Sequence, residues 1–271
     1  MKPYIHILGR NIPSYSLTAI IGFIAVFFVL WLICRKRTDV DHTQLPHLAV
    51  AAVIGTAIGA HLLYGIVNFR VFLYALNDDF SRLHTVTDYT GFVVSLFGGM
   101  VFYGGLIGAI VGFYWYLKVM KLPSEPYWDL FALSIPLFHG FARIGCFLGG
   151  CCYGIESKYG FVYHHLIPDS ANEVPRFPVQ LLESGLNFVL FFILLIMLLK
   201  NIGIGRLFYF YLIAYSIIRF FDEFLRGDTI RGFVGVISTS QFISIIIFIA
   251  ASGIFVARSI RNKQHTVKKE V

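Results

Sequence analysis

The sequence predicts an all-α membrane protein with about seven transmembrane helices, as its composition, its apolar runs and its basic residues indicate. Hydrophobic residues make up 57% of the 271 residues and charged residues 14%, and the mean hydropathy is +0.74. Soluble globular chains carry about 25% charged residues, so this composition excludes that class. A helix needs about 20 apolar residues to span a bilayer. Seven such runs occur, at 14–34, 46–67, 91–117, 127–149, 179–200, 206–225 and 234–257.

Lys and Arg residues in the connecting loops predict the orientation, because cytoplasmic loops carry an excess of them. Eight lie on one side. Twelve lie on the other side, within 35–37, 118–121, 200–206 and 258–269. We therefore expect an outer N-terminus, a cytoplasmic C-terminus, and the loops 68–90 and 150–178 on the outer face. The net charge of +7 reflects this topology and a basic tail at 258–271 close to anionic lipid, so no nucleic-acid partner is expected.

We expect residues 1–271 to form a single polytopic membrane domain. The first 17 residues lack the features of a cleaved signal peptide, so the first span is expected to be retained. The loop 68–90 mixes aromatic and polar residues, which predicts an interfacial segment. The loop 155–178 contains three prolines and predicts an irregular outer cap.

The third predicted span is rich in glycine. Gly104, Gly108 and Gly112 are four residues apart, and small residues at this spacing form a flat stripe against which another helix packs closely. Helix packing alone explains the stripe. A functional alternative is that Tyr103, beside Gly104 and Gly105, faces a place where a lipid or another backbone approaches.

Two arginines lie inside predicted spans, Arg143 and Arg219. A charge at bilayer depth costs about 3 kcal/mol on insertion scales and usually marks a functional site. His139, Arg143 and Cys146 follow at i, i+4 and i+7, so they share one face of a helix. Arg143 has no acidic residue at i±3 or i±4. Its partner must come from another helix or from a ligand, for which an anionic lipid head group is favoured. The alternative for His139 is a hydrogen bond to a nearby carbonyl.

The sixth predicted span ends with Arg219, Glu223 and Arg226, again at i, i+4 and i+7. One interpretation is a ladder of ion pairs within the helix. The other is that Glu223 orients both arginines and leaves guanidinium donors free for phosphate oxygens. Gln180 and Glu183 begin the fifth span and are either interfacial or hydrogen-bonded to the glycine-rich end of the fourth span.

Three of the four cysteines, Cys146, Cys151 and Cys152, lie near the predicted outer end of the fourth span. They are candidates for thiol chemistry. A disulfide would join Cys146 to Cys151 or Cys152, because adjacent cysteines rarely bond each other. The spacing matches no established zinc pattern, so we expect neither a metal nor a cofactor. Cys34 is expected to be an inert apolar filler.

Several segments match known motifs in order. Residues 142–154, ARIGCFLGGCCYG, correspond to G-R-[IL]-G-N-F-x-N-G-E-x-x-G, and YGGLIG at 103–108 corresponds to H-G-G-L-I-G. FPVQLLE at 177–183 corresponds to H-P-S-Q-L-Y-E, and RFFDEFLRGD at 219–228 to R-x-x-x-E-x-x-R-x-P-D. Asp129 and the segment STSQFISI around Gln241 complete the set. The chain thus resembles the phosphatidylglycerol–prolipoprotein diacylglyceryl transferases of bacterial membranes.

The resemblance implies a multi-pass enzyme of the bacterial cytoplasmic (inner) membrane. It would transfer a diacylglyceryl group from phosphatidylglycerol, a membrane lipid, to the lipobox cysteine in the signal peptide of a prolipoprotein. Arg143 and Arg219 would then be catalytic. Substrate contacts are expected from Tyr15, Gly104, Gly105, Gly145, Gly154, Gln180, Glu223 and Arg226.

The chain departs from the family pattern at positions that bear on the acceptor thiol. Tyr103 replaces a histidine, while Cys146 and Cys151 replace an asparagine and a glutamate. Other replacements are Ala142, Ala57 and Ala60. Tyr103 is the catalytic candidate by position, but a phenol with a reference pKa of about 10 is a poor base, so we hypothesise that His139 assumes the role. The alternatives are a thiol- or redox-active membrane paralogue and a non-catalytic relative that binds lipid or prolipoprotein.

Overall fold

A computed structural model describes most of the chain. The described residues are 2–7, 9–35, 37–67, 69, 73, 85, 90, 91, 94, 98, 99, 102–164, 172–228 and 233–270. Within them, five helices are long and apolar enough to cross a membrane. These are Ser14–Cys34, His42–Val67, Ser124–Gly149, Val179–Leu199 and Thr239–Ile260. The predicted class of α-helical membrane protein is confirmed at this level.

Two further helices are shorter. α5 (Phe102–Val119) has 18 residues, and α8 (Leu207–Asp222) has 16 before a 3-10 turn, η4 (Glu223–Leu225). At about 1.5 Å per residue, α8 is about 24 Å long, less than the ~30 Å hydrocarbon core. Most of loop 68–90 and of the predicted start of the third span lies outside the described residues.

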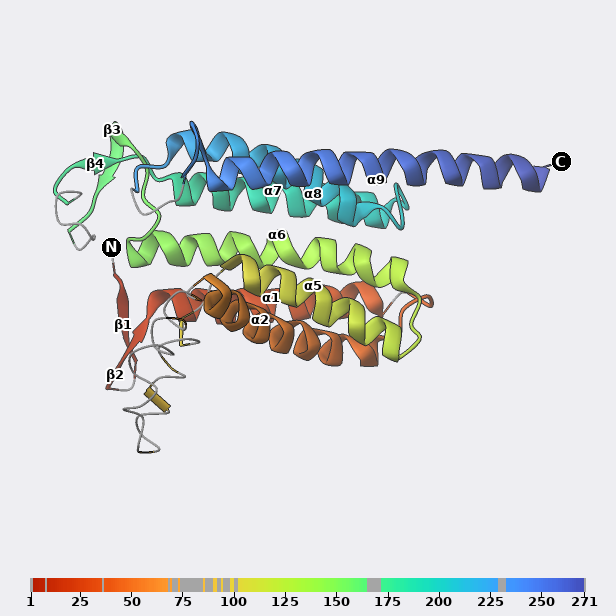
Figure 1. Cartoon of the computed structure of the whole chain (residues 1–271), viewed down its shortest axis with the longest axis horizontal. Helices are drawn as coiled ribbons and strands as arrows, with labels where there is room; N and C mark the ends of the chain where they lie inside the picture. The colour runs from red at the N-terminus through yellow and green to blue at the C-terminus, as the bar shows by residue number, and fades with distance from the viewer. Residues whose placement is uncertain are drawn as a thin grey trace. The chain divides into compact units, whose positions relative to one another are not determined.

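The chain forms two compact units, Met1–Arg37 with Glu125–Val271, and Thr38–Ser124. The smaller unit contains η1 (His42–Gln44), α2 (Leu45–Val67) and α5. α2 and α5 lie side by side in Figure 1 because their glycines face each other. A Cβ atom added to Gly104 would overlap the carbonyl oxygen of Gly59, and one on Gly108 would overlap that of Gly55. The glycine stripe is therefore filled by α2 of the same chain, as close helix packing predicts.

In the larger unit, α1 (Ser14–Cys34) packs against α6 (Ser124–Gly149). The rings of Phe23 and Phe138 are 4.6 Å apart. A Cβ atom on Gly145 would overlap the Thr18 hydroxyl and come within 3.0 Å of the Tyr15 backbone. Gly145 thus allows α1 to approach the segment of α6 that follows Arg143.

Helices α7 (Val179–Leu199), α8 and α9 (Thr239–Glu270) follow the same direction as α6 in Figure 1, and α8 contacts both α7 and α9. The Ser184 hydroxyl donates to the carbonyl of Gly140 at 2.8 Å, which joins α7 to α6. The Asp129 carboxylate accepts the backbone N–H groups of Gly205 and Leu207 at 2.6 and 3.1 Å. A side chain of α6 thereby accepts buried N–H groups that have no partner within α8 at its start.

Three short antiparallel pairs complete the fold. β1 (Tyr4–Ile7) pairs with β2 (Arg10–Pro13), and β5 (Phe233–Val234) with β6 (Ile237–Ser238). β3 (Glu156–Val162) pairs with β4 (Pro175–Arg176). The prediction of an irregular cap at 155–178 is therefore wrong at 156–162 and 175–176, where these two strands form. Gly160 permits the pairing, since a Cβ atom there would overlap the backbone of Arg176.

Candidate active site

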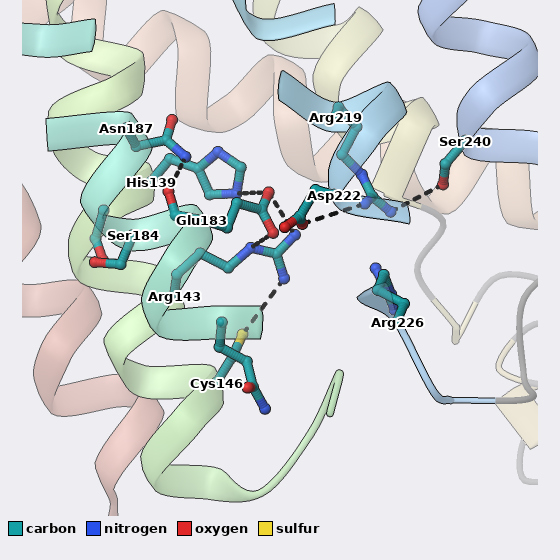
Figure 2. Close-up of polar contacts among 12 residues, drawn as sticks. His139, Arg143, Cys146, Glu183, Ser184, Asn187, Arg219, Asp222, Arg226 and Ser240 are labelled. Atoms are coloured by element: carbon teal, nitrogen blue, oxygen red, sulfur yellow. Dashed lines mark hydrogen bonds and ion pairs between the residues drawn. The ribbon is translucent and has the colours of Figure 1, made fainter. Parts of the chain in front are cut away.

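One face of α6 carries the first part of the site. His139, Arg143 and Cys146 point to the same side of the helix, as predicted from their spacing (Figure 2). The guanidinium of Arg143 donates from Nη1 to Cys146 Sγ at 3.9 Å. The Nε2 atom of His139 is 3.6 Å from Glu183 Oε1. The same carboxylate also contacts Arg143.

Glu183 of α7 is the partner of Arg143. Its Oε2 atom is 2.7 Å from Arg143 Nε, and its Oε1 atom accepts Arg143 Nη2 at 3.0 Å. The sequence left open whether another helix or a ligand pairs with Arg143. In the structure, the partner is a residue of another helix. The Glu183 side chain is 3% exposed and that of Arg143 13%. Breaking a buried pair of this kind costs about 3–5 kcal/mol because it leaves an uncompensated charge.

A second arginine–carboxylate group lies at the end of α8. Arg219 Nη2 is 2.7 Å from Glu223 Oε2, and Arg219 Nη1 is 3.7 Å from Asp222 Oδ2. Nη2 also donates to Ser240 Oγ of α9 at 3.1 Å. Glu223 therefore orients Arg219, in agreement with both interpretations of the sequence. Arg219 Nη1 has no hydrogen-bond partner with suitable geometry within the described residues.

Glu183 joins the two groups. Its carboxylate interacts electrostatically with that of Asp222 and accepts the Tyr215 hydroxyl at 3.2 Å. Figure 2 shows the carboxylate of Glu183 beside Arg143 of α6 and Asp222 of α8, with Arg219 on the other side of Asp222. The result is one polar network that draws on α6, α7, α8 and α9. Its two guanidinium groups are held in place by carboxylates that are almost fully buried.

Arg226 lies beside this network (Figure 2). We expected Glu223 to orient it. The structure gives it an ion pair with Asp228, with distances of 2.9 Å from Nε to Oδ1 and 2.5 Å from Nη2 to Oδ2. Burial alone would lower the pKa of Arg226, but the hydrogen bonds and charge of Asp228 outweigh it and raise that pKa. Arg226 thus stays charged next to the site.

The turn after α6 brings the three cysteines together. Gly150 and Cys152 have φ angles of +77° and +57°, a left-handed conformation that non-glycine residues rarely adopt. The Sγ atoms of Cys146, Cys151 and Cys152 all lie within 4.8 Å of one another. Hydrogen bonds with the other two thiols, and then the charges of Arg143 and Arg226, lower the pKa of Cys152. All four cysteines of the chain are free thiols, so the disulfide weighed from the sequence is not present.

Gln180 fixes this turn from α7. Its side-chain amide donates to the carbonyl of Cys151 at 2.7 Å and accepts the Tyr163 hydroxyl at 3.3 Å. Burial raises the pKa of Tyr163, which keeps the hydroxyl protonated as a donor. Of the two interpretations of Gln180, hydrogen bonding to the glycine-rich helix end is confirmed.

Two further predicted residues border the turn. Tyr15, near the start of α1, is in electrostatic contact with Arg143 and with all three clustered thiols. Gly154 lies where backbones converge, since a Cβ atom there would overlap the carbonyl oxygen of Phe177. Its backbone also pairs with that of Arg226. Both residues are thus part of the surroundings of the site.

Tyr103, Gly104 and Gly105 belong to the smaller unit. Tyr103 lies in the first turn of α5, and its side chain is not among those described. Gly104 faces α2, and a Cβ atom on Gly105 would be 3.2 Å from the Thr56 side chain. Substrate contact by these three residues stays a prediction.

Sequence reasoning did not assign several residues of the network and its surroundings to the site. These are Glu183, Tyr215, Asp222 and Ser240 of the network and Asp228, the partner of Arg226. Glu183 and Asp222 had a usable signal, because an acidic residue within an apolar run needs a buried cation as its partner. Tyr215 and Ser240 had none, since single hydroxyl groups are common in such helices.

Comparisons with known proteins agree with this picture. A family model described as prolipoprotein diacylglyceryl transferase matches residues 3–257. A phosphatidylglycerol–prolipoprotein diacylglyceryl transferase of Clostridium tetani is 35% identical over 259 residues, which cover 94% of this chain and 96% of the relative. A protein of Clostridium perfringens named phosphatidylglycerol–prolipoprotein diacylglyceryl transferase 2 is 33% identical over 274 residues, which cover 97% of each chain. One from Chlorobaculum tepidum is 30% identical over 94% of this chain and 89% of its own length. The chain therefore belongs to the prolipoprotein diacylglyceryl transferase family.

Proposed function

We propose that this protein transfers the diacylglyceryl group of phosphatidylglycerol to the thiol of a lipobox cysteine in a prolipoprotein. This is the first step of lipoprotein maturation. The thiol sulfur forms a bond to C3 of the diacylglyceryl glycerol, the C–O bond to phosphate breaks, and glycerol 1-phosphate leaves with the electron pair. The reaction makes two demands, which are to stabilise the departing phosphate and to provide a thiolate.

The observation that carries the proposal is the pair of oriented arginines, Arg143 and Arg219. Arg143 uses Nε and Nη2 for Glu183, and its Nη1 donates to a thiol, a weak acceptor. Arg219 keeps Nη1 without a well-aligned acceptor among the described residues. Both side chains retain 12–13% exposure. These two donors suit phosphate oxygens, and the fixed carboxylates mean that little reorganisation is needed.

His139 is our candidate for accepting the thiol proton. It lies one helical turn from Arg143, and its Nε2 atom is near Glu183. Its ring also packs against Tyr215, with 5.4 Å between ring centroids, so its orientation is fixed. A general base needs a fixed position within reach of the proton that it takes. His139→Ala should slow transfer, and an unchanged rate would exclude this role.

We also propose the membrane placement that the basic residues indicate. The protein would cross the bacterial inner membrane seven times, with the N-terminus outside and the C-terminus in the cytoplasm. The Lys and Arg bias between the two loop sets supports this orientation. Cysteine accessibility to a membrane-impermeant reagent, with single cysteines placed in loops 200–206 and 155–164, would test it.

The proposed reaction can be tested with purified protein in detergent. The substrates are phosphatidylglycerol and a lipobox peptide, and the readouts are glycerol phosphate release and the peptide mass. We expect a diacylglyceryl adduct that needs the peptide cysteine and is lost in Arg143→Gln. An absence of adduct from folded protein that still binds the lipid would instead support a non-catalytic relative.

A further inference from the structure

We propose that Cys146, Cys151 and Cys152 hold a zinc ion whose fourth position binds and activates the thiol of the acceptor cysteine. The inference rests on the proposed transfer reaction and addresses the demand for a thiolate. Three protein ligands and one open position are the arrangement of catalytic zinc sites, whereas structural sites are closed by four.

The geometry of the sulfur atoms fits such an ion. Zinc–sulfur bonds of about 2.3 Å in a tetrahedron place the sulfur atoms about 3.8 Å apart. The three Sγ atoms already lie within 4.8 Å of one another. Small rotations of the side chains would complete the site without a change of the backbone.

The backbone that presents the thiols is fixed from several directions. The N–H of Cys151 donates to the carbonyl of Cys146 at 3.1 Å, and the amide of Gln180 donates to the carbonyl of Cys151 at 2.7 Å. Cys152 has a left-handed backbone conformation, and its Sγ atom lies within 4.8 Å of the other two. Because this turn brings sequence neighbours to one point, the spacing alone did not suggest a zinc site.

The charges around the thiols suit a bound ion. Three thiolates and one zinc ion have a net charge of −1. Arg143 donates from Nη1 to Cys146 Sγ, and Arg226 interacts electrostatically with Cys152. Hydrogen bonds and positive charge outside the ligand shell stabilise such an anionic group.

The site is also open to an incoming ligand. Cys146 is buried, Cys152 is half-buried and Cys151 is exposed. The ion therefore has an entry path, and the fourth position can face a substrate thiol. A thiol that coordinates zinc loses its proton, because the ion favours the thiolate.

This arrangement places nucleophile and leaving group close together. A thiolate bound beside Cys146 would lie next to Arg143, which we assign to the phosphate, so both reacting groups would be positioned by neighbouring side chains. The thiolate sulfur bonds to the glycerol carbon, the carbon–oxygen bond to phosphate breaks, and the electron pair goes to the phosphate. The thiol proton passes to water at the exposed side of the cluster and from there to His139. Zinc would thus supply the activation that Tyr103 is poorly suited to give.

The first test measures metal binding without turnover. Full-length protein in detergent is reduced, freed of metal and titrated with Cd²⁺, and the thiolate-to-cadmium charge-transfer absorption is recorded. We expect one ion per chain, affinity reduced by more than about tenfold in Cys152→Ser, and no change in Cys34→Ser. No band in the wild type, or an equal band in Cys152→Ser, would overturn the site.

A second readout needs no variant. Zn²⁺ should protect the three clustered thiols of the wild type from alkylation, as measured by peptide mass spectrometry. Equal alkylation with and without Zn²⁺ would overturn the site.

The third readout tests activation. Adding a lipobox peptide to the cadmium-loaded protein should intensify the band, whereas the same peptide with serine in place of cysteine should not change it. Transfer should fall more than about tenfold on chelation and return with Zn²⁺. Full transfer by zinc-free protein would overturn the zinc inference but leave the proposed reaction intact. A responsive band without any transfer would instead overturn the proposed reaction.

Discussion

Buried charged side chains lie near both ends of α8, and the kind of partner that holds them differs between the two ends. At the start, the Asp129 carboxylate accepts two backbone N–H groups, from Gly205 and Leu207. At the other end, Arg219 is held by the carboxylates of Asp222 and Glu223. Backbone donors cannot be released without unfolding, so the first region serves the fold. Guanidinium groups retain donors that a ligand can use, so the second region suits chemistry.

The largest effect is expected at the link between the two arginine groups. Glu183→Gln keeps the shape of the side chain but removes the charge that faces Arg143 and His139. Transfer should fall about 10²- to 10³-fold, as for loss of an oriented electrostatic group. Unfolding should also become easier by about 3 kcal/mol. Transfer assays and thermal unfolding measure the two effects. Unchanged transfer would mean that the network is structural, like the Asp129 region.

Asp129→Asn tests the structural region. The amide can still accept one of the two backbone donors, and its other end no longer carries charge. The free energy of unfolding should fall by about 1–3 kcal/mol, whereas transfer per folded molecule should stay within about twofold of the wild type. A large loss of rate with unchanged stability would contradict the division between the two regions.

Gly108→Ala probes the packing of the smaller unit, which contains neither charged region. The added Cβ atom would overlap the carbonyl oxygen of Gly55, so α2 and α5 must separate. We expect a destabilisation of about 1–3 kcal/mol, measured by thermal unfolding in detergent. Ala109→Gly, at the next position of α5, is a matched control for a change of one methyl group. Equal effects of the two variants would mean that close packing of α2 and α5 is not what Gly108 provides.

The sequence predicted contacts between residues that are close together in the chain, but not contacts between residues that are far apart in it. The common face of His139, Arg143 and Cys146 follows from helical spacing, and so does the pair of Arg219 with Glu223. The partner of Arg143 did not follow, because Glu183 reaches it from a helix 40 residues away in the chain. Convergence of the three thiols depends on a left-handed turn at Cys152, a conformation that side-chain type does not predict. The β3–β4 pair was missed for a similar reason, since it depends on the backbone approach at Gly160.

The most direct test of the arginine assignment compares two arginines on one helix. Arg219→Gln removes a guanidinium from the network, while Arg206→Gln removes one at the other end of α8, where it donates to Ser259 at 2.9 Å. Rates of diacylglyceryl transfer to a lipobox peptide should be measured for both, per folded molecule. We expect Arg219→Gln to lose about 100-fold or more and Arg206→Gln to stay within about twofold of the wild type. Equal rates in the two variants would contradict a role of Arg219 in handling the phosphate.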